Sequence, residues 1–272
     1  PCSYYTDVAP TFVVQPRLFE KKPAKNAKNA KNAKNIKGLL VTAYGAYGRP
    51  TKVGRLILKW KPLLERGWAI ASVCVPGSGD HDVAWKKAGQ RQNRGEAIRV
   101  FTETVQRLQE ELGIAASATA LYGRSAGGLL VISAATLTPG LVGALYVESP
   151  YVDVLRTISN PELPLTLLET KEFGIGTNPT NVLTTGAWSP MEHIPARPAE
   201  PAEPATPAKG ISDLFVVARS DLADLEVYPY EVVKWIWRLR SMRSRRSMRK
   251  IQRQGKKLLY IHSGQGHFTT GF

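Results

Sequence analysis

Apolar segments and amphipathic segments alternate along this chain. Residues 95–114 carry apolar side chains in steps of three and four, at Ile98, Phe101, Val105, Leu108 and Leu112. That spacing gives an α-helix one apolar face. Further helices are predicted after residue 125, ending at about residue 135, and over residues 230–240. Short apolar runs of strand length separate these helices, at 36–48, 69–79, 118–122, 141–149, 212–220 and 256–264.

Apolar strands that alternate with helices are typical of a mostly parallel sheet covered by helices on both faces. The pattern therefore predicts an α/β fold. In such sheets, functional groups gather in the loops at the carboxyl ends of the strands. Four polar side chains lie just past a predicted strand, namely Tyr44, Ser125, Asp224 and His267. We expect them to lie at one edge of the sheet.

The length of 272 residues and the hydrophobic share of 43% allow one substantial core or two small ones. No apolar run approaches the roughly 18 residues of a membrane span. The first residues lack the features of a secretory signal, and the absence of an initiator Met favours a piece of a longer chain. Cys2 and Cys74 indicate neither a disulfide framework nor a thiolate metal site, so a reducing, cytoplasmic setting is the default.

The net charge of +15 raises the question of a nucleic-acid partner. Much of the excess lies in two biased segments, the Lys-Asn-Ala repeat of 21–37 and the Arg-rich run of 238–257. Neither segment interleaves aromatic residues with basic ones, as stacking on single-stranded nucleic acid requires. Solvated charge is the favoured interpretation, and a nucleic-acid partner is disfavoured.

Composition also predicts the domain organisation. Residues 1–35 are expected to form a tail that contains the Lys/Asn/Ala insert, and residues 36–272 a single domain. Within that domain, residues 196–210 are rich in Pro, Ala and Glu, which is typical of a stiff, exposed spacer.

Residues 123–127, Gly-Arg-Ser-Ala-Gly, match the pattern G-x-S-x-G between a predicted strand and a predicted helix. A sharp strand-turn-helix places its serine in strained geometry, and small flanking residues let the two elements approach closely. The helix then directs its first N–H groups at the site. A purely structural tight turn would give the same pattern, but the context favours Ser125 as a nucleophile.

A serine nucleophile needs a base. Of the four histidines, His267 lies in a Gly-flanked loop after the last predicted strand, whereas His81, His193 and His262 lie in an early loop, a Pro-rich region and a strand. His267 is therefore the predicted base. An acid that orients the imidazole is expected after the preceding strand, which offers Asp221, Asp224 and Glu226; spacing alone does not separate the two aspartates.

These motifs resemble the prolyl oligopeptidase family of serine peptidases, and its oligopeptidase B branch in particular. The stretches that carry the resemblance are YGRSAGGLL, TAYGAYG, YVDVLRTISNPELPLT and WSPMEHI. The resemblance implies an α/β-hydrolase fold with Ser125 as nucleophile, Asp224 as acid and His267 as base. It favours Asp224 over Asp221, because the family's tryptophan lies eleven residues after the acid and Trp235 fits that register. It also implies an oxyanion hole built from the Tyr44 hydroxyl and the Ala126 N–H.

The chain departs from the family where relatives that cut after Lys or Arg carry two glutamates for substrate binding. Here LLETKEFG keeps Glu169 and Glu172 but has Lys171 at the second position. A lysine there opposes a cationic substrate side chain. The β-propeller that caps the catalytic domain in the family is not in this sequence, so the resemblance implies it as a partner domain outside this chain.

The sequence thus predicts the catalytic domain of a serine-type endopeptidase or oligopeptidase that acts on oligopeptides through an acyl-enzyme. No metal, organic cofactor or membrane partner is implied. One alternative is an esterase or acyl hydrolase on the same triad. The other is a catalytically inactive, prolyl-oligopeptidase-like interaction domain.

Overall fold

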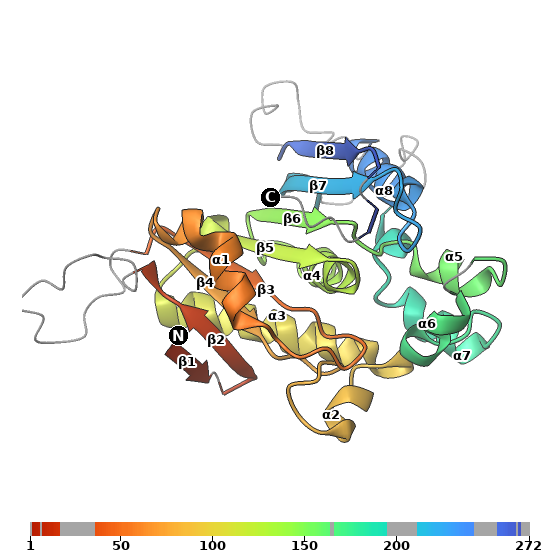
Figure 1. Ribbon diagram of the computed structural model, residues 1–272, viewed down its shortest axis with the longest axis horizontal. Coiled ribbons are helices and arrows are strands. Elements are labelled where there is room, and N and C mark those ends of the chain that lie inside the picture. Colours follow the sequence, from red (N-terminus) through yellow and green to blue (C-terminus); the bar gives the residue numbers. More distant parts are fainter. Residues whose placement is uncertain are drawn as a thin grey trace, which may run out of the picture.

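One β-sheet organises the chain in the computed structural model, which describes residues 2–5, 7–16, 36–163, 166–194, 211–241, 255–264 and 266–267 (Figure 1). Within these ranges the sheet has eight strands in the order β1-β2-β4-β3-β5-β6-β7-β8. The strands are β1 (Cys2–Tyr5), β2 (Pro10–Val14), β3 (Gly38–Thr42), β4 (Trp68–Val73), β5 (Thr119–Arg124), β6 (Ala144–Glu148), β7 (Phe215–Asp221) and β8 (Lys257–His262). The strands from β3 to β8 pair in parallel, and β1 and β2 are antiparallel. The predicted α/β-hydrolase fold is confirmed.

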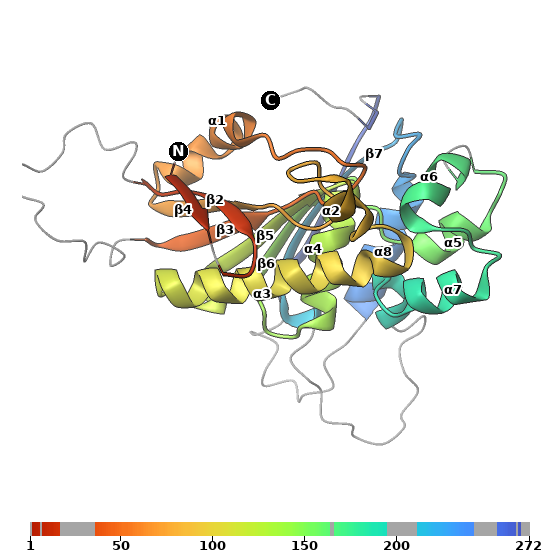
Figure 2. The ribbon, with the colours of Figure 1, turned by 90° about the horizontal axis from the view of Figure 1, so that it is seen from below.

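Helices cover both faces of this sheet. They are α1 (Val53–Leu64), α2 (Val83–Lys87), α3 (Arg94–Leu112), α4 (Ala126–Leu137), α5 (Val154–Ser159), α6 (Thr166–Phe173), α7 (Pro179–Gly186) and α8 (Pro229–Ser241). In Figure 2, α1 lies on one side of the sheet and α3, α4 and α8 on the other. The helices α5 to α7 gather beyond the carboxyl ends of the strands (Figure 1).

Two apolar layers hold the helices against the sheet. The smaller layer lies under α1, where Leu64 packs with Leu40 of β3 and Ile70 of β4. The larger layer contains all five apolar residues that predict the helix over 95–114, and all are buried in α3. The helix α4 is buried along most of its length, because it lies beneath the centre of the sheet.

The strands β1 and β2 lie within residues 1–35, the predicted N-terminal tail, and they extend the sheet at its β4 edge. The Pro/Ala/Glu insert of 196–210, nearly all of the Lys-Asn-Ala repeat and the middle of the Arg-rich run lie outside the described residues. Of the Arg-rich run, Arg238 and Arg240 donate to the carbonyls of Met191 and Lys257. Within the described ranges no helix is long and apolar enough to cross a membrane.

Candidate active site

Ser125 lies at the junction of β5 and α4 in a strained backbone conformation. Its φ of 53° and ψ of −125° fall in a region that residues with a side chain rarely adopt. Two backbone hydrogen bonds hold this conformation. The Ser125 N–H donates to the Glu148 carbonyl, and the Ser125 carbonyl accepts from the Tyr151 N–H. The neighbouring strand β6 and the loop after it therefore fix the turn.

The glycines on either side of Ser125 are required by close approach. A Cβ on Gly123 would lie 2.3 Å from the Gly127 carbonyl oxygen. A Cβ on Gly127 would lie 2.7 Å from the Ala43 carbonyl oxygen, in the loop that carries Tyr44. The G-x-S-x-G pattern thus lets strand, helix and a second loop meet around one serine.

Asp224 and His267 form a buried pair. The His267 Nδ1 lies 2.8 Å from Asp224 Oδ2 and 3.0 Å from Oδ1. Asp224 Oδ1 also accepts from the Val227 N–H at 2.9 Å. Burial acts to raise the pKa of Asp224, but hydrogen bonds from His267, the Val227 amide and Ser149 outweigh it, so that pKa lies below its usual value. Asp224 is therefore held as a carboxylate against the imidazole.

A further contact brings His267 to the Ser125 turn. Arg124, the residue before Ser125, donates to the backbone carbonyl of His267. On the other side of the ring, His267 Nε2 lies 3.3 Å from the carboxylate of Glu226, an exposed side chain. Of the three candidate acids, Asp224 thus contacts Nδ1 and Glu226 contacts Nε2, whereas the Asp221 carboxylate accepts from the Ala223 N–H.

Tyr44 follows β3 and lies near the Ser125 turn. Tyr44 lies against Gly127, two residues after Ser125, because a Cβ on Gly127 would be 3.4 Å from Tyr44. Burial raises the pKa of Tyr44, so the phenol remains protonated and can donate. The Arg49 guanidinium lies 5.6 Å above the Tyr44 ring. Ala126 is the first residue of α4, where an N–H has no partner within the helix.

Arg94 is a buried residue beneath this site that the sequence pattern does not reveal. Its side chain is 0% exposed, and Nη1 donates to the Gly45 carbonyl, next to Tyr44. Nη2 lies 3.4 Å from the Ala126 carbonyl. Arg94 thus joins the loop of Tyr44 to the start of α4. An arginine at the start of an amphipathic helix normally points to solvent, so no local signal indicates its burial.

The two glutamates predicted to bind substrate lie on α6 and are engaged differently. The Tyr47 hydroxyl donates to the Glu169 carboxylate, at 2.8 Å and 2.7 Å from its two oxygens. Burial raises the pKa of Glu169 to about 7. Glu172 is buried, and it accepts from Gln90 at 2.8 Å and lies 3.9 Å from Arg94.

The remaining histidines lie apart from this constellation. His193 contacts the Ala187 carbonyl at 3.0 Å, His81 packs against Trp85, and His262 ends β8. In the part of the chain that the structure describes, no group of three His, Cys, Asp or Glu side chains is placed to hold a metal ion. The strand ends bring together a hydroxyl, an imidazole and carboxylates, from Ser125, His267 and Asp224.

Comparison with known proteins gives several matches. Protease 2 of Moraxella lacunata is 26% identical over 205 residues, which are 75% of this chain and 28% of that protein. The prolyl endopeptidase-like protein of Gallus gallus is 36% identical over 136 residues, 50% of this chain and 18% of that one. Oligopeptidase B from Leishmania major has the same fold, with a TM-score of 0.72 at 23% identity, over 87% of this chain and 30% of that structure.

The chain spans less than a third of the length of each of these proteins. The model of the prolyl oligopeptidase family matches residues 57–270, which include the Ser125 turn, Asp224 and His267. A match of that extent, on an α/β-hydrolase fold, identifies this chain as a member of the prolyl oligopeptidase family.

Proposed function

We propose that this chain is the catalytic domain of a serine-type peptidase that cleaves oligopeptides through an acyl-enzyme on Ser125. The observation that carries the proposal is the buried Asp224–His267 pair, with 2.8 Å between Oδ2 and Nδ1, which a hydrogen bond from Arg124 to the His267 carbonyl joins to the strained Ser125 turn. A serine at such a turn with a carboxylate-bound imidazole next to it is the arrangement that activates a hydroxyl for acyl transfer.

In the first half-reaction, Ser125 Oγ attacks the carbonyl carbon of the scissile bond and gives its proton to His267 Nε2. Asp224 accepts a hydrogen bond from Nδ1–H, so the imidazole keeps the tautomer in which Nε2 can receive a proton. The imidazolium that forms is stabilised by the same carboxylate. The exposed Glu226 side chain lies 3.3 Å from Nε2, so it must move away before Nε2 can receive the Ser125 proton.

The tetrahedral intermediate carries its negative charge on the former carbonyl oxygen. The Ala126 N–H and the Tyr44 hydroxyl donate to this oxygen. Arg94 holds the backbone on both sides of this pair, at Gly45 and Ala126. One donor of this kind contributes roughly 3 kcal/mol to lowering the barrier.

Collapse of the intermediate breaks the C–N bond, and His267 gives its proton to the leaving amine. A water molecule then attacks the Ser125 ester, with His267 again accepting the proton. Release of the carboxylic acid restores the Ser125 hydroxyl.

The domain assignment and the wider setting belong to the same proposal. Residues 36–272 hold the proposed catalytic groups, and the family match lies within them. Oligopeptides are the proposed substrates, a β-propeller outside this chain is the proposed partner domain, and the cytoplasm is the proposed location.

Labelling with a fluorophosphonate probe tests the nucleophile. We expect the wild-type chain to be labelled, and Ser125→Ala to lose labelling and turnover while keeping its far-UV circular dichroism spectrum. Ser133→Ala, a change of the same kind in α4, serves as a control that keeps the label. Equal labelling of the Ser125 variant and wild type would refute the assignment.

The same preparations separate peptidase from esterase. A peptidase cleaves fluorogenic peptide amides as well as p-nitrophenyl esters, since both react through the Ser125 acyl-enzyme. Turnover of esters alone would favour the esterase alternative. A folded wild-type chain that neither reacts with the probe nor turns over either substrate would favour the inactive interaction domain.

A further inference from the structure

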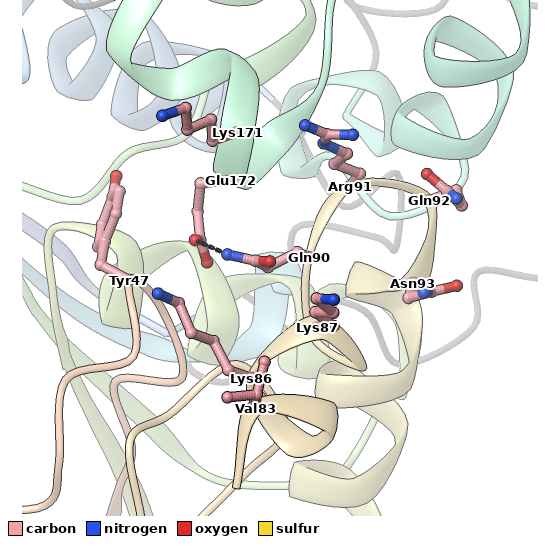
Figure 3. Close-up of a pocket in the computed structure, with 10 residues that line it drawn as sticks. All are labelled: Tyr47, Val83, Lys86, Lys87, Gln90, Arg91, Gln92, Asn93, Lys171 and Glu172. Atoms are coloured by element: carbon pink, nitrogen blue, oxygen red, sulfur yellow. Dashed lines mark hydrogen bonds between the residues drawn. The ribbon is translucent and has the colours of Figure 1, made fainter.

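A pocket of about 680 Å³ opens beside Tyr47, and its lining is rich in basic side chains (Figure 3). Four cationic residues from three separate elements line it, namely Lys86 and Lys87 of α2, Arg91 of the 3₁₀ helix Arg91–Asn93, and Lys171 of α6. In Figure 3 they surround a centre that is formed by Gln90 and Glu172.

The one acidic residue of the lining is already neutralised from within the protein. Glu172 Oε2 accepts from Gln90 Nε2 at 2.8 Å, and Oε1 lies 3.9 Å from the buried Arg94 guanidinium. This carboxylate and Arg94 cancel each other's charge. The charge that the pocket presents to a ligand is therefore that of its four cationic side chains.

These four side chains take part in none of the ion pairs formed among the described residues. A single exposed lysine is normally a solvated charge. Four cationic side chains around one concave surface instead create a positive potential that attracts anions. Their spread over three elements means that the fold, not a local run of sequence, gathers them.

The pocket adjoins the proposed catalytic site. The Tyr47 ring lies in its wall, with its centroid 6.2 Å from that of Tyr44. Tyr44 in turn lies against Gly127, two residues after Ser125. A peptide bound at Ser125 can therefore place a group close to the scissile bond into this pocket.

The two carboxylates near the pocket that could bind a basic substrate residue already have partners within the protein. The Glu169 carboxylate accepts from the Tyr47 hydroxyl with both oxygens, and Glu172 is bound by Gln90 and Arg94. Lys171, on the same helix, lines the pocket. The balance of charge at this wall favours an anionic group of the substrate over a cationic one.

We propose that this pocket binds a carboxylate of the peptide substrate close to the scissile bond, so that the enzyme prefers acidic peptides. The inference rests on the proposed peptidase function. A carboxylate can come from a Glu or Asp side chain or from the peptide's own C-terminus. Both present the same group to Lys86, Lys87, Arg91 and Lys171.

Matched peptides test the preference and separate its two sources. One set is amidated at the C-terminus and carries a single Glu, Gln or Lys at each position near the scissile bond in turn. The other set carries Gln throughout and has either a free or an amidated C-terminus. We expect kcat/KM to be about tenfold higher for the carboxylate member of a matched pair at one position, because four cationic side chains act together on that one group.

A charge reversal shows whether the pocket causes the preference. Lys171→Glu is expected to reduce the ratio of Glu to Gln turnover by about tenfold or more and to raise turnover of the Lys peptide. Lys256→Glu is the matched control, because this exposed lysine precedes β8 at the opposite end of the sheet. It changes the net charge equally and should leave the ratio as in wild type.

A binding measurement on Ser125→Ala keeps this inference separate from the proposed function. Calorimetric titration with the preferred carboxylate peptide and its Gln or amide counterpart is expected to show the same tenfold preference, lost in Ser125→Ala/Lys171→Glu. If wild type reacts with no probe and cleaves no peptide, the proposed function fails and this binding test alone decides on the pocket. The pocket inference is overturned if carboxylate and neutral peptides bind equally, or if Lys256→Glu changes the preference as much as Lys171→Glu.

Discussion

Two carboxylates contact the two nitrogens of His267, and only one is suited to a catalytic role. Asp224 is buried and meets Nδ1 with both oxygens, whereas Glu226 is exposed and lies near Nε2. An acid that fixes the imidazole tautomer must contact the nitrogen that faces away from the serine. The contacts of His267 thus favour Asp224 as the orienting acid, and the family register also favours Asp224 over Asp221.

Replacing each carboxylate by its amide distinguishes their roles. We expect Asp224→Asn to lower kcat by roughly 10³–10⁴-fold, because the amide permits the wrong tautomer. Glu226→Gln should change kcat by less than about tenfold, since its partner nitrogen is the one that must become free for proton transfer. Rates from peptide hydrolysis by both variants check this expectation. Similar losses in the two would contradict the role given to Asp224.

At the level of single residues, the sequence suggests candidate reactive side chains but does not indicate the residues that hold them in place. Ser125 and His267 can be found because a turn motif and a Gly-flanked loop have local signals. Arg94 and Tyr47 have none, since the burial of Arg94 and the Tyr47–Glu169 hydrogen bond depend on segments far away in the chain. The basic pocket is missed for the same reason, because three elements supply its cations.

Among the elements, those with a strong apolar pattern are predicted and those without one are missed. The helix α3 and the parallel strands appear at their expected places. The helix α1 is an exception, because it is amphipathic, but Pro62 inside it and Gly54 near its start argue against a helix in the sequence. The strands β1 and β2 are short, and only pairing with β4 reveals them. The helix α6 is a short segment beyond the sheet, where no periodic pattern marks it.

The close contact between α4 and the loop of Tyr44 requires a glycine at position 127. Gly127→Ala brings a methyl group to 2.7 Å from the Ala43 carbonyl oxygen, so backbone must shift. We expect the free energy of unfolding to fall by about 1–3 kcal/mol in urea denaturation, as for overpacking elsewhere. Gly54→Ala in α1 is the control, because nothing lies within 4 Å of the added methyl group. It should stabilise the protein by up to about 1 kcal/mol. If both substitutions changed the free energy of unfolding equally, the close approach of Gly127 to Ala43 would not constrain the residue at position 127.

Across the whole molecule, a buried acid ties the last helix to the loop that supports Ser125. Glu231 of α8 accepts from the Val152 and Asp153 N–H groups, at 3.2 Å and 3.0 Å. Lys234, one turn later, binds the Asp153 carboxylate at 2.7 Å. The Tyr151 N–H of the same loop donates to the Ser125 carbonyl. The position of Ser125 is thus coupled to the packing of a helix that begins more than a hundred residues later.

This buried acid gives the stability of the fold a pH dependence. Burial raises the pKa of Glu231 to about 7, above the value of an unfolded chain. The folded state then retains a proton that the unfolded state has released. The free energy of unfolding should therefore decline between about pH 4.5 and pH 7, by up to roughly 3 kcal/mol from this group. Glu169, whose pKa burial also raises to about 7, acts in the same direction.

Urea denaturation of wild type and Glu231→Gln over that pH range isolates the contribution. The amide keeps an oxygen that can accept the two backbone N–H groups but does not titrate. We expect its free energy of unfolding to decline less steeply between pH 4.5 and pH 7 than that of wild type. Parallel pH profiles would mean that Glu231 does not retain its proton in the folded protein.

The proposed base lies just after β8, which stands at one end of the strand order and, among the described strands, pairs with β7 alone. A terminal strand can detach while the central strands and the core around α4 stay intact. Such a detached state would keep its spectroscopic signature of folding and its Ser125 turn, yet it would have no imidazole to activate the hydroxyl. We therefore expect the fold of the central sheet and the completeness of the proposed site to be separate conditions, because the proposed base depends on the pairing of β8 with β7.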